Sequence, residues 1–318
     1  MVLTFLFWAL PGGLGLLLVL AVFRTRSMAA QAPKLVPLVG QVHRLRDGAI
    51  HYLDLGPKDA QPLVLIHGLS GQLQHFDYGL TDLLKDEFRV IAVDRPGCGY
   101  SERADDALAD PSEQARMIGE LLDALGIERP VLVGHSLGGA VALAMALDRP
   151  DKTGALALLC PVTQDQSGVP EVFKGLQVRS PWMRRLLGHT IAVPLAAATK
   201  DKVLSIVFHP EPWPQDFMTR GGAALGLRPK AFVTAASDVV ALQAAAARIS
   251  ARYDHDLTVP GGVLFGAADA ILSPTAHGHT MQVHGLSCET LADRGHMIPI
   301  TAPADCADFI RRMAARVT

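Results

Sequence analysis

The sequence predicts an α/β fold with a mostly parallel sheet, helices on both of its faces, an inserted and mainly helical lid, and an N-terminal transmembrane helix. Three observations lead to this prediction. Apolar runs of strand length alternate with helical stretches over most of the chain. The alternation stops between residues 161 and 252, and residues 1–23 contain no charged side chain. Because alternating strands and helices are typical of βαβ units, the strands are expected to be parallel.

Residues 1–23 carry the transmembrane prediction. At about 1.5 Å per residue, a helix of this length reaches roughly 35 Å, enough for a hydrocarbon core of about 30 Å. A secretory signal has its positive charge before the apolar stretch, whereas Arg24 and Arg26 come after it. An uncleaved anchor is therefore favoured over a cleaved signal, which would be cut after Ala30-Gln31-Ala32, and over a buried hydrophobic helix.

The basic residues near this segment predict its orientation. Arg24, Arg26 and Lys34 all follow the apolar stretch. Because basic residues that flank a span remain on the cytoplasmic side, we expect a single-pass membrane protein whose main domain faces the cytoplasm. Residues 24–40 are then expected to be a linker.

The strands are expected where continuous apolar runs occur. Residues 62–66 (PLVLI) and 89–93 (RVIAV) are apolar throughout, as expected of strands buried on both faces. Further strands are expected at residues 130–133, 155–159, 262–265 and 285–291, and two short ones within 41–55 around a turn at Asp47-Gly48.

The helices are expected between these strands. A helical stretch follows residues 62–66 as far as about residue 86. Asp110 or Ser112 can cap a helix that Gly126 ends. Two more helices are expected at residues 137–147 and 304–316. The domain boundaries follow: anchor 1–23, linker 24–40, core 41–160, lid 161–252 and core 253–318.

The composition excludes several classes of protein. The 318 residues include 29 basic and 31 acidic side chains, a net charge of −2, which argues against a nucleic-acid-binding protein. A hydrophobic content of 49% excludes disorder. Four cysteines without a C-x-x-C pair argue against a structural zinc site or a disulfide scaffold.

The sequence Gly134-His135-Ser136-Leu137-Gly138 is a G-x-S-x-G motif between an expected strand and an expected helix. In this context the motif forms a sharp turn, the nucleophile elbow, which presents the serine hydroxyl beside a helix N-terminus. Ser136 is therefore the candidate nucleophile, and His135 is expected to pack away from the reacting face.

A serine nucleophile needs a base that is itself oriented by an acid, and in such enzymes the chain order is serine, acid, histidine. Asp269 follows the expected strand at 262–265, and His296 follows the one at 285–291. We expect Asp269 to be the acid and His296 the base, with Asp165 as the alternative acid. His277 and His279 form an H-x-H pair, but no third ligand at zinc-like spacing lies near them, so no metal site is expected.

The segment after residues 62–66 predicts the oxyanion hole. A glycine at position 68 lets the loop pass close to the reacting atoms, so the backbone N–H of Leu69 is one candidate donor. The N–H of Leu137, which follows the nucleophile, is the other. The glycine-rich loop at residues 94–101 lacks the context of a phosphate-binding loop, and we expect it to shape one wall of the site.

The motifs HGL, DRPGCGYS, GHSLGG, GAAD and GHM, in this order, resemble the α/β-hydrolase fold superfamily of serine esterases and lipases. The resemblance covers about residues 41–160 and 255–316 and implies the same triad and oxyanion donors. Haloalkane dehalogenases and epoxide hydrolases share this architecture but have an aspartate at the elbow. The order of anchor, core and short cap is similar to that of membrane-anchored monoacylglycerol lipases.

The resemblance implies a serine hydrolase that cleaves carboxylic esters through an acyl-enzyme, without a cofactor or metal. Apolar residues of the lid and the anchor favour a small lipophilic or acylglycerol-like ester as substrate. The same triad can also catalyse C–C, amide or lactone hydrolysis or perhydrolysis. A further alternative is a membrane-anchored binding protein that lacks catalysis.

Overall fold

A nine-stranded sheet forms the centre of the computed structural model, which describes residues 2–165 and 168–317. The strands are β1 Gln41–Leu45, β2 Gly48–Leu55, β3 Pro62–Ile66, β4 Arg89–Val93, β5 Glu102–Arg103, β6 Val131–His135, β7 Ala155–Leu159, β8 Gly261–Gly266 and β9 Ser287–Leu291. Their order is β1-β2-β4-β3-β6-β7-β8-β9, and β5 pairs with β2. Strands β4 to β9 of this path are parallel, and the pairings of β2 are antiparallel.

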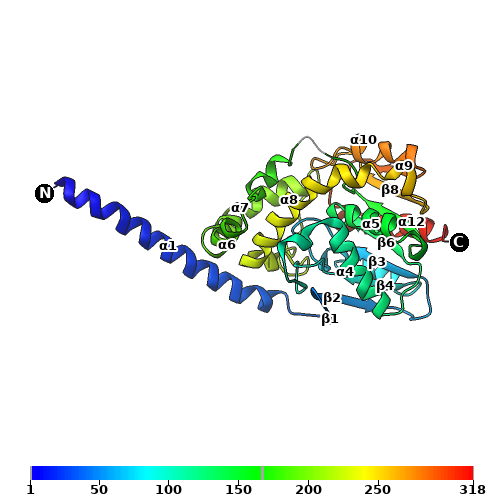
Figure 1. The fold of residues 1–318 in the computed structure, drawn as a ribbon, viewed down its shortest axis with the longest axis horizontal. Helices are drawn as coiled ribbons and strands as arrows, with labels where there is room; N and C mark the ends of the chain where they lie inside the picture. Colours follow the sequence, from blue (N-terminus) through cyan, green and yellow to red (C-terminus); the bar gives the residue numbers. More distant parts are fainter. Residues whose placement is uncertain (1, 166–167, 318) are drawn as a thin grey trace.

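Helices cover both faces of this sheet (Figure 1). The core helices are α2 Gln74–Asp77, α3 Leu80–Leu84, α4 Pro111–Ala124, α5 Leu137–Asp148, α9 Tyr253–Asp256, α10 Pro274–His277, α11 Ile298–Thr301 and α12 Pro303–Ala314. Helices α3 and α12 pack together on one side, and α4 packs on α5 on the other. The predicted fold class is thus confirmed for the core.

The central strands form because they are apolar on both faces. Every residue of β6, β7 and β8 is buried, as expected of parallel strands between two helix layers. Helix α5 is buried all round apart from its last residue, and its many small residues allow it to lie close to the strands. Asp110 caps α4 by accepting a hydrogen bond from the N–H of Ser112, at the boundary that the sequence predicted.

The residues between β7 and β8, here called the helical insertion (161–252), contain no strand in their described part. Its elements are the 3₁₀ segments η3 Glu171–Leu176 and η4 Ala223–Leu227 and the helices α6 Pro181–His189, α7 Ala192–Val207 and α8 Pro229–Ser250. Among the described residues, α8 is long and apolar enough to cross a membrane, but half of its apolar window is buried inside the protein.

Helix α1 Val2–Leu35 projects away from the rest of the protein (Figure 1). It continues well past residue 23, so most of the expected linker at 24–40 is helical and only the last few residues are irregular. The reason is packing: Thr25 donates a hydrogen bond of 2.6 Å to the carbonyl of Thr190 in the insertion. The side chains of residues 1–14, which include much of the predicted transmembrane segment, lie outside the described part.

The chain between α1 and β1 is held by buried polar contacts. The hydroxyl of Tyr100 donates to the carbonyl of Val36 at 2.5 Å. His51 is fully buried; its Nδ1 lies 2.6 Å from Asp94 Oδ2, and its Nε2 bonds the carbonyl of Val39. Because both ring nitrogens face acceptors, both must carry a proton, so His51 is an imidazolium in this arrangement.

The buried pair of His51 and Asp94 predicts that the stability of the fold depends on pH. Burial disfavours the charged form of His51, but the hydrogen bond and charge of Asp94 outweigh it and raise the pKa of His51 above the ordinary 6.5. While Asp94 is ionised, the proton on His51 therefore contributes its full stabilisation below pH 6.5, and this contribution is lost as the pH rises through the raised pKa. We expect the free energy of unfolding of the full chain in detergent to fall over that window.

The control for this measurement is His51→Gln, which cannot titrate and whose side-chain NH2 can donate to one of the two acceptors, Asp94 or the Val39 carbonyl. The difference in unfolding free energy between the two proteins should shrink as the pH rises. A difference that stays constant from pH 6 to pH 9 would show that His51 is neutral in the folded protein.

Candidate active site

Ser136 lies at the turn from β6 into α5, with a backbone φ of 54° and ψ of −121°. A non-glycine residue is strained at such a φ, and the turn is possible because its neighbours are small. A Cβ on Gly138 would lie 2.0 Å from the carbonyl oxygen of Ile66, and one on Gly134 would lie 2.6 Å from that of Gly138. The glycines of the motif therefore allow strand and helix to approach closely at Ser136, which is 8% exposed.

Asp269 and His296 lie together beyond the ends of β8 and β9. Oδ2 of Asp269 is 2.7 Å from Nδ1 of His296. Oδ1 accepts from the N–H groups of Ile271 (2.8 Å) and Leu272 (2.9 Å). Burial opposes ionisation of Asp269, yet the adjacent His296 and these N–H groups hold its pKa below the ordinary value. The carboxylate is thus ionised and fixes the orientation of the imidazole.

Asp165, the alternative acid, is exposed, and Asp269 rather than Asp165 is the carboxylate hydrogen-bonded to His296.

His135 connects the serine turn to His296. Its Nε2 is 3.0 Å from the carbonyl oxygen of His296, and the two rings have centroids 5.0 Å apart. Burial, followed by the neighbouring His296, lowers the pKa of His135 to about 3, so this ring is neutral and packs between the two segments. Among the described residues no hydrogen bond joins Ser136 Oγ to His296; such bonds are often long in unliganded enzymes and tighten when substrate binds.

The loop after β3 passes directly over the serine. A Cβ on Gly68 would lie 2.8 Å from Cβ and 3.3 Å from Oγ of Ser136, so only glycine allows this approach. Leu69 and Leu137 line the same pocket as Ser136. The structure therefore gathers at one pocket the serine and the two residues expected to supply oxyanion N–H groups.

This pocket has an empty volume of about 610 Å³ and a mainly apolar lining. Besides the residues already placed, its apolar walls are Val162, Val169, Pro170, Phe173, Val239, Leu242, Ala246, Ile271 and Leu272. Many of these come from the helical insertion, whose helix α8 forms one wall. The polar side chains of Gln164, Asp165 and Gln243 also line the pocket.

Among the described residues, one cluster of side chains has the chemistry of metal ligands. Cys160, Asp269 and His296 offer atoms within 4.8 Å of one another, but burial raises the pKa of the Cys160 thiol well above its ordinary value. A protonated thiol is a poor metal ligand. His277 is buried and lies near the N–H of Thr163, whereas His279 is exposed, so this H-x-H pair does not converge on one point.

The loop at residues 94–101 does not line the pocket, contrary to the expectation from its sequence. Instead, Asp94 and Arg95 are fully buried beneath the His67–Gly68 segment. The reason is that their side chains bond backbone groups of neighbouring loops: Arg95 donates to the carbonyls of His67 and Gly68. Sequence reasoning missed this role, although two charged residues directly after a buried strand were a usable signal.

The approach of Gly68 to Ser136 predicts a sensitive position. Gly68→Ala would place a methyl group against Ser136 and displace the loop, so we expect the reaction of Ser136 with a fluorophosphonate to slow by about tenfold or more, because the oxyanion donors are misplaced. Gly79→Ala is the matched control, since its methyl group would meet no atom within 4 Å. Equal labelling rates in the two folded variants would contradict this geometry.

Comparison with known sequences places this arrangement in a family. Residues 63–309 match the alpha/beta hydrolase family. RutD of Variovorax paradoxus, named as a carbamate hydrolase, is 40% identical over 110 residues, which are 35% of this chain and 41% of RutD. Haloalkane dehalogenase 2 of Mycobacterium tuberculosis is 35% identical over 127 residues, 40% of this chain and 43% of that protein. The matches cover less than half the length of these relatives.

Solved structures show the same fold. A protein named as a lipase from Acinetobacter baumannii superimposes with a TM-score of 0.69 at 19% identity, covering 92% of this chain and 96% of that one. A membrane phospholipase A has the same TM-score at 22% identity and covers 99% and 98%. The family match spans most of the chain and includes every residue of the site described above. The chain belongs to the alpha/beta hydrolase family.

Proposed function

We propose that this protein is a serine hydrolase that cleaves carboxylic esters through an acyl-enzyme. The observation that carries the proposal is the position of Ser136, on a strained turn at an apolar pocket. His296, whose carbonyl oxygen is hydrogen-bonded to the residue before Ser136, is oriented by the buried carboxylate of Asp269. The serine at the elbow separates this site from those of haloalkane dehalogenases and epoxide hydrolases, whose nucleophile is an aspartate.

The mechanism follows from the roles of these groups. Neutral His296 accepts the proton of Ser136 as Oγ attacks the ester carbonyl, and the negative charge develops on the carbonyl oxygen. The N–H groups of Leu69 and Leu137 bind this oxyanion, and Asp269 stabilises the imidazolium. His296 then protonates the departing alcohol, which leaves an acyl group on Ser136. Water, deprotonated by His296, attacks that acyl group and releases the acid.

The pocket favours a lipophilic acyl group. Its lining is mainly apolar, so an acyl chain that enters it leaves water without losing hydrogen bonds. The helical insertion supplies much of this lining and serves as the lid of the active site. Acylglycerols and other lipophilic esters are the substrates that fit this chemistry.

Helix α1 is proposed to anchor the protein in a membrane by a single span. In its described part the side chains of Leu16, Leu17, Val19, Leu20 and Phe23 are each more than half exposed. Such an exposed apolar stretch is unfavourable in water and favourable in a bilayer. Arg24, Arg26 and Lys34 follow on the side of the catalytic domain, which is therefore proposed to face the cytoplasm.

The ester-hydrolase proposal is tested by rates on p-nitrophenyl esters of increasing chain length, measured beside diketone, amide and lactone substrates. We expect ester hydrolysis to be fastest, with chains longer than acetyl preferred, because the pocket is apolar. A fluorophosphonate probe should label the wild type and leave Ser136→Ala unlabelled. Folded wild-type protein that resists the probe would indicate a binding protein instead.

Two carboxylate variants test the assignment of the acid. Asp269→Asn should lower kcat by about 10³- to 10⁴-fold, because it removes the charge that orients and stabilises the imidazole. Asp165→Asn, which changes an exposed pocket residue, should alter kcat by less than about tenfold. Similar losses in both variants would contradict the assignment.

The anchor is tested by deleting residues 2–23, which retains Thr25 and the segment packed on the insertion. We expect the full chain to remain in the membrane fraction after alkaline carbonate washing, whereas the shortened chain becomes soluble and still hydrolyses a water-soluble ester. A full chain released by carbonate would contradict a transmembrane helix.

A further inference from the structure

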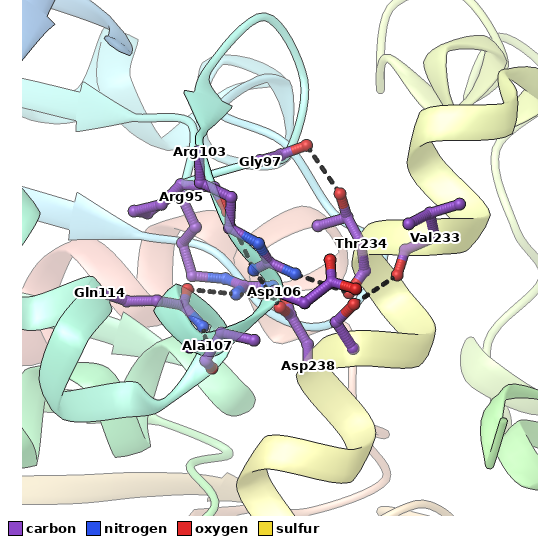
Figure 2. Close-up of polar contacts among 12 residues, drawn as sticks. Arg95, Gly97, Arg103, Asp106, Ala107, Gln114, Val233, Thr234 and Asp238 are labelled. Atoms are coloured by element: carbon purple, nitrogen blue, oxygen red, sulfur yellow. Dashed lines mark hydrogen bonds and ion pairs between the residues drawn. The ribbon is translucent and has the colours of Figure 1, made fainter. Parts of the chain in front are cut away.

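A buried ion pair joins the helical insertion to the core, as Figure 2 shows. Arg95 Nη1 lies 2.8 Å from Asp238 Oδ2, and the side chains of both residues have no exposed surface. Arg103 Nη1 lies 2.6 Å from the other oxygen of Asp238, and Arg95 Nη1 also donates to Gln114 at 2.7 Å. Since transferring charges from water to the interior carries a large desolvation penalty, such a pair is a poor source of stability.

The other side of the same guanidinium holds the loop that passes over Ser136. Arg95 Nε donates to the carbonyl of His67 at 2.8 Å, and Nη2 donates to the carbonyl of Gly68 at 3.0 Å. Each of these bonds is charge-assisted and buried, so it constrains the loop strongly.

His67 reinforces the contact at the Gly68 carbonyl. Its Nε2 accepts the backbone N–H of Arg95 at 3.0 Å, so its proton must lie on Nδ1, which then donates to the Gly68 carbonyl at 2.8 Å. Burial and the nearby Arg95 charge keep the pKa of His67 well below its ordinary value, in agreement with a neutral ring. The Gly68 carbonyl therefore accepts two buried hydrogen bonds.

This carbonyl belongs to the same peptide unit as the N–H of Leu69. Because a peptide unit is planar and trans, its N–H points opposite to its C=O, and fixing one fixes the other. Donors at the carbonyl also polarise the amide, which makes its N–H a stronger donor. The residues that hold the Gly68 carbonyl thus control both the direction and the strength of the proposed oxyanion donor.

We propose that Arg95 is a positioning residue that couples the helical insertion, through Asp238 of α8, to the Leu69 N–H of the oxyanion hole. The inference rests on the proposed function. Asp238 is adjacent to Val239, which lines the pocket, so one helix both forms the pocket wall and holds the guanidinium. The position of α8 relative to the core then determines how well the site stabilises the oxyanion.

The test compares Arg95→Lys with Arg103→Lys in the full chain. Both variants keep the positive charge, and both shorten the side chain that reaches Asp238. Within the described part of the chain, the other hydrogen bonds of Arg103 go to the carbonyls of Pro96 and Thr234 and not to the loop over Ser136. A lysine cannot reproduce the fork of donors at position 95. We expect kcat of Arg95→Lys on a p-nitrophenyl ester to fall about 10- to 100-fold with KM within about twofold, because loss of a whole donor costs 10²- to 10³-fold. Arg103→Lys should stay within about threefold.

Two further measurements distinguish a positioning role of Arg95 from a nonspecific structural effect of the substitution. Affinity for an alkyl boronic acid, whose oxygen occupies the oxyanion hole when boron bonds Ser136, should fall by about the same factor as kcat in Arg95→Lys only. Amide hydrogen exchange in the segment 67–73 should be faster in Arg95→Lys than in Arg103→Lys. Folded variants that match in kcat, boronate affinity and exchange would overturn the proposal.

The variant Asp238→Asn tests the contact between Arg95 and the helical insertion. It also tests the proposal if Arg95→Lys does not fold. This variant leaves the guanidinium of Arg95 hydrogen-bonded to the loop but removes the negative charge that holds the guanidinium in place. We therefore expect an intermediate fall in kcat, about 3- to 10-fold, and faster amide hydrogen exchange in residues 67–73. An unchanged kcat and exchange would overturn the coupling. If the wild type hydrolyses no ester, the proposed function fails, while the exchange measurements still decide whether Arg95 positions the loop.

Discussion

The close approach of three backbone segments at Ser136 is the constraint on which the rest of the site depends. The strand β6, the helix α5 and the loop after β3 meet where Gly134, Gly138 and Gly68 leave no room for a Cβ. The serine between them has a positive φ, a conformation that costs energy and persists only because the surrounding sheet and helix hold it. A rigid parallel sheet buried on both faces provides that support.

The buried ion pairs of this protein fix the positions of loops more than they stabilise the fold. His51 and Asp94 hold the chain between α1 and the sheet, and Arg95 and Asp238 hold the insertion against the loop over the serine. In each pair the cationic residue also donates a hydrogen bond to a backbone carbonyl, His51 to that of Val39 and Arg95 to that of Gly68. The charged side chains therefore fix the positions of loops. Replacing a buried ion pair by apolar residues is often neutral or stabilising, but apolar side chains cannot fix the direction of a peptide group by hydrogen bonding.

Other contacts relate helix α1, the proposed anchor, to the pocket of the active site. Helix α1 contacts the insertion through Thr25 and Ala32. Ala32 and Val36, which follows the helix, lie with Ala224 and Leu225 in a small apolar cluster. The insertion in turn lines the pocket. The proposed anchor is thus attached to the proposed lid, an arrangement that suits the lipophilic esters proposed as substrates.

The sequence by itself determined the parallel core and the candidate residues Ser136, Asp269 and His296, because buried strands read as continuous apolar runs and the chemistry follows their carboxyl ends. It also placed the glycine at position 68 beside the nucleophile. Tertiary structure alone decided that Asp269, and not Asp165, bonds His296, that α1 extends to Leu35, and that Arg95 bonds the loop that passes over Ser136. These features depend on contacts between residues far apart in the chain, and local periodicity contains no information about which distant partner a buried charge will meet.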